Sequence, residues 1–131
     1  MKLETLTPNL MVDDINQTIN YYHGVLSFTT LDKMANDKGE LIWARLKKGD
    51  VEIMFQQEDS LKAELPEIRK ESIGGGFTLY ITMAGVDEFY EYLYTTADVV
   101  AQLKNKLYGM REFTIRDING YYLTFAEPIK K

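Results

Sequence analysis

The chain has 131 residues, 45% hydrophobic and 27% charged, a composition that indicates one globular domain and disfavours disorder or a fibrous structure. A net charge of −5 disfavours nonspecific nucleic-acid binding, and zero cysteines exclude disulfides, thiolate nucleophiles and Cys-based zinc sites. The first residues, MKLETLTPNLMV, lack the apolar run of a signal peptide, and no stretch approaches the roughly 18 apolar residues of a membrane span. We therefore expect a soluble cytoplasmic protein that binds neither nucleic acid nor membrane.

The first half of the chain predicts a strand, a helix and three further strands. Residues 5–12 alternate as a strand does, with Leu6, Leu10 and Val12 on the covered side. Asp13 and Asp14 are N-cap candidates for a helix that Gly24 loosens or ends, and its apolar positions are Ile15, Ile19, Tyr22 and Leu26. Residues 28–35, 41–46 and 51–57 predict three consecutive antiparallel strands.

The second half repeats this order. Residues 76–83 alternate, residues 86–93 have helical spacing, and residues 99–103, 110–116 and 121–125 predict strands. Val12 and Ile15 match Met83 and Val86 at an offset of 71 residues. At an offset of 70, Trp43 matches Phe113 and Phe55 matches Phe125, which makes KKGD and DING equivalent hairpin turns.

The repeat predicts an α+β fold of two tandem βαβββ modules, a curved mixed sheet with helices on its outer face and a concave cleft. We expect one domain over residues 1–131, with module 1 at about residues 3–57, a linker that holds a short helix at about 58–74, and module 2 at about 75–128. The alternation predicts that Leu10, Val12, Leu79, Ile81, Leu123 and Phe125 pack beneath the helices. The side chains predicted to line the cleft are Thr7, Asn9, Met11, Glu52, Met54, Gln56, Thr78, Tyr80, Tyr122 and Thr124.

Four segments together resemble the vicinal oxygen chelate superfamily, which groups glyoxalase I, extradiol dioxygenases, and fosfomycin and bleomycin resistance proteins. They are TPNLMVDDINQTINYYHGVLSF, WARLKKGDVEIMFQQ, YITMAGVDEFYEYL and MREFTIRDINGYYLTFAEP, and they cover nearly the whole chain. The Pro-Asn-Leu strand and the Trp-x-x-Leu-x-x-Gly-Asp hairpin are most similar to the bleomycin resistance group.

The resemblance implies positions at which metal-dependent members hold a divalent ion through His or Glu. In this chain those positions fall on Thr7, Thr78 and Thr124, and on Met54, or on Ile53 if the hairpin slips by one residue. None of these side chains is a usual ligand for zinc, nickel or manganese. We therefore expect no metal ligand among them, and no cofactor.

Few other side chains offer chemistry. His23 is the only histidine and is expected at the helix surface, and Glu127 is expected to lie beyond the last strand. Glu52 is the only catalytic candidate, but no His or Cys can assist it, and it is as readily solvated or paired with Arg45 or Arg111. The chain is therefore more readily interpreted as a binding protein than as an enzyme.

Flat rings stack on planar or cationic ligands, and five aromatic residues are candidates for this role. They are Trp43, Tyr80, Tyr108, Phe113 and Tyr122, each of which could equally pack in the core or at a dimer interface. Arg45 and Arg111 complete the candidate ligand-binding set. The facing of Arg111 relative to Glu112 is open, because a one-residue bulge would exchange them.

The favoured hypothesis is a homodimer of the bleomycin resistance type that holds a small aromatic or cationic molecule without a metal. One alternative is a glyoxalase-type or lyase-type enzyme whose metal is held by unexpected donors such as Glu52. Another is a regulatory module whose aromatic surface recognises a protein partner.

Overall fold

The computed structural model describes residues 1–130, which divide into two compact units, Met1–Ile73 and the residues from Gly74 onward. Each unit contains a four-stranded sheet and one long helix, in the order predicted for a βαβββ module. Within residues 1–130, every helix is too short or too polar to traverse a bilayer.

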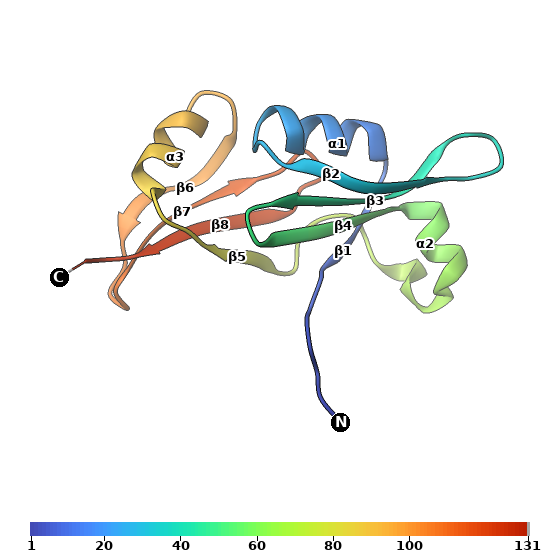
Figure 1. Ribbon diagram of the computed structural model, residues 1–131, viewed down its shortest axis with the longest axis horizontal. Helices are drawn as coiled ribbons and strands as arrows, with labels where there is room; N and C mark the ends of the chain where they lie inside the picture. The colour runs from blue at the N-terminus through green and yellow to red at the C-terminus, as the bar shows by residue number, and fades with distance from the viewer. Residues whose placement is uncertain (131) are drawn as a thin grey trace. The chain divides into compact units, whose positions relative to one another are not determined.

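The first unit orders its strands β1-β4-β3-β2, with β1 parallel to β4 and the other pairs antiparallel (Figure 1). Its elements are β1 (Asn9–Val12), α1 (Ile15–Gly24), β2 (Thr29–Ala35), β3 (Leu41–Lys48), β4 (Val51–Gln57), α2 (Glu58–Glu64) and the 3-10 helix η1 (Pro66–Lys70). Asp14 caps α1 by accepting a hydrogen bond from Gln17 N at 3.0 Å, and α1 ends at Gly24, both as predicted. The Tyr22 ring of α1 packs on Phe55 of β4 at 4.8 Å, which fixes the helix-covered side of this sheet.

The second unit orders its strands β5-β8-β7-β6, with β5 parallel to β8. Its elements are β5 (Thr78–Thr82), α3 (Val86–Leu93), β6 (Asp98–Asn105), β7 (Met110–Arg116) and β8 (Tyr122–Pro128). The Phe89 ring of α3 lies 4.9 Å from Phe125 and 6.2 Å from Phe113. These contacts place both phenylalanines under the helix and complete an aromatic core.

The first strand is shorter than the alternation of residues 5–12 predicts. It begins at Asn9, and Leu6, which was expected on the covered side, is exposed. Residues 1–8 run away from the sheet (Figure 1), although Pro8 O still accepts a hydrogen bond from Met54 N at 2.8 Å. The alternation correctly predicted the facing of Leu10 and Val12, but no strand in residues 9–130 pairs with the residues before Pro8 to continue the strand.

The predicted equivalence of Trp43 and Phe113 is wrong by one residue. Phe55 pairs with Ala44, whereas Phe125 pairs with Phe113, so the structural counterpart of Phe113 is Ala44. The hairpin turns differ in length: two residues separate Lys48 from Val51, and five separate Arg116 from Tyr122. The loops thus differ by an odd number of residues, which shifts the pairing of β7 with β8 by one residue relative to that of β3 with β4. Because side chains alternate with a period of two, this shift exchanges the two faces of the strand.

The run of three glycines before β5 has a steric reason at Gly74. Its φ is +85°, and a Cβ there would lie 2.9 Å from Asn119 O, closer than any side chain tolerates. Gly74 therefore lets the chain pass against the loop of residues 117–121, which Asp117 orders by accepting from the backbone N–H groups of Asn119 and Tyr121.

Candidate functional site

Each sheet has one face turned away from its long helix. In the first unit Phe55 contacts α1, so its strand neighbours project from the opposite face. Residues that are directly paired on neighbouring strands have side chains on the same face, so the strand pairing identifies the residues of this face on β1 and β3 as well. We call this surface the first open face, and its residues include Asn9, Met11, Trp43, Arg45, Lys47, Glu52, Met54 and Gln56.

The first open face carries a connected group around Arg45. The guanidinium carbon lies 5.9 Å from the Trp43 ring centroid, and Nη1 lies 3.6 Å from Glu52 Oε1. Nη2 donates to the Met54 sulfur at 3.6 Å. Arg45 Nε is buried, and no acceptor in residues 1–130 reaches it. A buried N–H without an acceptor is unusual in a folded protein.

One end of the first open face is closed by a polar network to α2. Gln56 is buried, accepts from Asn9 Nδ2 at 2.9 Å, and donates to Ser60 Oγ at 3.1 Å and Glu64 Oε2 at 3.3 Å. The linker that was expected to hold a short helix thus forms α2, one end of which is tied to the sheet. Asn9 and Gln56 have a visible structural role in addition to any ligand contact.

The second open face is defined in the same way. It is the face turned away from Phe113 and Phe125, and its residues include Thr78, Tyr80, Lys104, Glu112, Thr114, Arg116, Tyr122 and Thr124. Thr124 is buried, and its hydroxyl lies 2.8 Å from that of Thr114 on the neighbouring strand. The two hydroxyls satisfy each other in the middle of the sheet.

Glu112 is the buried acid of the second open face. Only 7% of the residue is exposed, and both carboxylate oxygens accept from phenols. Tyr80 Oη donates to Oε2 at 2.6 Å, and Tyr108 Oη donates to Oε1 at 2.5 Å. The hydrogen bond to Glu112 is the first cause that raises the pKa of Tyr80 to about 12, and it also raises the pKa of Tyr108.

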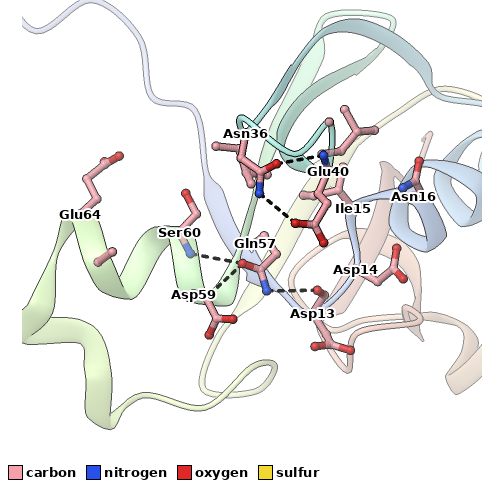
Figure 2. Close-up of a pocket in the computed structure, with 14 residues that line it drawn as sticks. Asp13, Asp14, Ile15, Asn16, Asn36, Glu40, Gln57, Asp59, Ser60 and Glu64 are labelled. Carbon is pink, nitrogen blue, oxygen red and sulfur yellow. Dashed lines mark hydrogen bonds between the residues drawn. The ribbon is translucent and has the colours of Figure 1, made fainter.

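A separate hollow of about 1010 Å³ lies in the first unit between the start of α1, the β2–β3 hairpin and α2 (Figure 2). Its lining includes five carboxylates and no Lys or Arg. Figure 2 shows the Gln57 amide in the middle, where it donates to Asp13 O and caps the first turn of α2. Asp14 caps α1, Glu40 accepts from Asn36, and Glu64 accepts from Gln56, so these three acids have structural partners.

Comparisons with known proteins agree with these two sheets. The sequence profile of the Glyoxalase/Bleomycin resistance protein/Dioxygenase superfamily matches residues 4–125. The chain belongs to this superfamily. Uncharacterized proteins of Mycobacterium bovis and Mycobacterium tuberculosis (strain ATCC 25618 / H37Rv) are each 27% identical over 128 residues. These cover 96% of this chain and 84% and 75% of theirs, respectively.

Solved structures share the fold at low identity. TioX from Micromonospora sp. ML1 has a TM-score of 0.73 at 22% identity, with 96% of this chain and 99% of that chain covered. A glyoxalase-related enzyme from Clostridium phytofermentans has a TM-score of 0.76 at 17% identity, with 98% of both chains covered. The bleomycin-binding protein from Streptomyces verticillus, complexed with copper(II)-bleomycin, has a TM-score of 0.63 at 17% identity, with 100% of this chain and 99% of that chain covered.

The donor set of this superfamily member does not fit the metal site that the resemblance implies. Thr78 and Thr124 lie on the second open face and Met54 on the first, while Thr7 precedes β1 and lies outside the sheet. In residues 1–130, no three His, Cys, Asp or Glu side chains gather where they could share a metal ion. Hydroxyls and a thioether are poor ligands for the ions concerned. A metal-free site stays a prediction, and we derive no chemistry through a metal.

Three further expectations about candidate side chains are corrected. Phe113 is 1% exposed and lies under α3, so it is not on the open face. Arg111 also lies on the helix side, where Nε donates to Asp87 Oδ1 at 2.7 Å, and this settles its facing relative to Glu112. Glu127 lies within β8 and accepts from the N–H groups of Gly85 and Val86, so it caps α3.

The remaining ligand-binding candidates lie on the two open faces or next to them. Trp43, Arg45, Glu52 and Asn9 share the first open face, Tyr80 and Tyr122 share the second, and Tyr108 reaches Glu112 from the turn before β7. His23 is exposed on α1, as expected. The sequence reasoning missed Glu112 as a site residue. One feature of the sequence could have identified it. Glu112 directly precedes Phe113 in a strand, so once Phe113 is known to be buried under the helix, alternation places Glu112 on the opposite face.

Proposed function

We propose that this superfamily member is a small-molecule binding protein that holds a planar aromatic ligand without a metal. The observation that carries the proposal is the Trp43–Arg45 pair on the first open face. The indole and the guanidinium offer flat, partly exposed surfaces on which a planar ring can stack. A planar aromatic molecule fits such a surface.

Membership of the superfamily supports a ligand-binding role at the family level. Copper(II)-bleomycin is bound by a structurally similar protein, although the identity is too low to carry the ligand across. We propose an antibiotic-like aromatic compound, sequestered in the cytoplasm, because a chain without cysteine is insensitive to the reducing conditions there. The metal-dependent enzyme and the protein-binding module remain the alternatives.

We also propose that the binding form is a homodimer. Each four-stranded sheet has two edge strands, β1 and β2 in the first unit and β5 and β6 in the second. Exposed edges present unpaired backbone groups that another chain can cover. A second copy of this chain would therefore bury edge strands.

Trp43 is the only tryptophan, so its fluorescence reports on the first open face alone. We expect bleomycin or the planar cation 10-methylacridinium to change this emission saturably and to raise the melting temperature. Chelator-treated protein should behave identically, and Arg45→Met should weaken binding about tenfold through loss of guanidinium stacking. The absence of both responses for every planar compound tried would reject the ligand class. Stoichiometric nickel, zinc or manganese in the purified protein would favour the enzyme instead.

A further inference from the structure

Glu112 on the second open face is a buried charged group that the binding function proposed above does not use. Glu112 is 7% exposed, yet the hydrogen bonds that it accepts come from two neutral phenols. The four ion pairs formed within residues 1–130 do not include it. A buried carboxylate is ordinarily matched by a cation.

The two arginines of β7 have aspartate partners of their own. Arg111 belongs to the neighbouring position on β7 but projects to the helix side, where it pairs with Asp87. Arg116 pairs with Asp98 at 3.0 Å. Lys104 lies directly opposite Glu112 on β6, but its side chain is exposed and its ammonium is more than 4 Å from every carboxylate oxygen of residues 1–130. Lys104 therefore competes for this role.

The phenols around Glu112 remain accessible. Tyr80 is 49% exposed and Tyr108 is 65% exposed, so each presents ring surface to solvent while its hydroxyl is tied to the carboxylate. Aromatic faces beside a carboxylate are the chemistry that recognises ammonium and amidinium groups, through cation–π attraction and charge pairing. An anionic ligand group would meet repulsion at the same place.

We propose that Tyr80, Glu112 and Tyr108 form a subsite on the second open face that binds the positively charged group of an organic cation. The carboxylate forms an ion pair with the cation and accepts a hydrogen bond from it where the cation has an N–H. The two tyrosines orient the carboxylate and cover the cation with their rings. A carboxylate oxygen can accept more than one hydrogen bond, so the phenols need not leave when the cation arrives.

The test compares two probes of nearly the same shape, 10-methylacridinium, a permanent cation, and acridine, which is neutral in mildly alkaline buffer. We expect calorimetric titration to show that the wild-type protein binds the cation about tenfold more tightly than the neutral probe, as one buried charge contact warrants. Glu112→Gln keeps the shape and one acceptor oxygen but should reduce the preference to about one. The matched control Glu88→Gln removes the same charge from the exposed surface of α3 and should leave the preference intact.

The ratio of the two affinities separates recognition from folding, because a merely structural role of Glu112 would weaken both probes equally. Equal wild-type affinity for the two probes would overturn the subsite while leaving the binding function standing. A preference that appears only in Lys104→Met would show that Lys104 is the resident counter-ion, and this too would overturn the proposal. Failure of both probes to bind would reject the subsite, whereas bleomycin binding followed through Trp43 decides the proposed function separately.

Discussion

The phenol of Tyr80 is half-exposed, yet its proton is held by a buried carboxylate. The hydrogen bond to Glu112, followed by desolvation, raises its pKa from 10.0 to about 12. The folded state thus binds this proton more tightly than the unfolded chain does. The stabilisation is complete below pH 10 and is lost as the pH rises through 12. We expect the phenolate absorbance of wild-type protein to include a step near pH 12.

The same absorbance titration on two variants assigns that step. Tyr80→Phe should remove it, and Glu112→Gln should move it toward pH 10, because the carboxylate that retains the proton is gone. A curve for Glu112→Gln that coincides with the wild-type curve would mean that Glu112 does not control Tyr80. Tyr108 shares the carboxylate, so its own transition should also fall in Glu112→Gln.

At the scale of single elements, α3 depends on a strand residue for its N-terminal cap. Gly85 occupies the N-cap position with no side chain to accept a hydrogen bond, and Glu127 of β8 accepts from Gly85 N and Val86 N at 3.1 Å each. Loss of a capping acceptor destabilises a helix by roughly 1 kcal/mol. We expect Glu127→Ala to accelerate amide hydrogen exchange at the start of α3 about fivefold.

The matched control for this prediction is Glu91→Ala, which removes an exposed carboxylate from the middle of α3. Exchange at Gly85 and Val86 should change little in this variant. If the two variants exchange alike, the cap from β8 contributes nothing measurable to the helix. Glu127→Gln, which keeps one acceptor oxygen, should lie between wild type and Glu127→Ala.

The hairpins show why an element can be predicted while its facing is not. The repeat located β7 and β8 correctly, but the five-residue loop after Arg116 shifts the register of Phe113 by one residue relative to Trp43. The sequence contains both loops, yet the length of each depends on where strand pairing stops, which is a property of the folded sheet. Phe113 and Arg111 were therefore included among the ligand-binding candidates although they face the helix, the facing of Arg111 stayed open, and Glu112 was not named as a site residue.

For the whole molecule, the homodimer is the prediction that a single measurement decides. Each chain has a mass of 15.2 kDa, so sedimentation equilibrium should give about twice that value at micromolar concentration. The reason is the burial of edge strands that each sheet otherwise leaves unpaired. A mass equal to one chain at all concentrations would rule out the dimer, whereas a larger assembly in extract that is lost on purification would favour the protein-binding alternative.

The sequence by itself determined the tandem βαβββ order, the helix positions and the side of β1, β4, β5 and β8 that faces the helices, because these follow from local periodicity and capping. It also determined which residue types stand at the positions of the family's metal ligands. Only the tertiary structure decided the facing of β7, the buried state of Glu112 with its two tyrosines, and the use of Glu127 as a cap. Each of these joins residues from different strands or helices, and such contacts depend on register and packing, which local patterns do not encode.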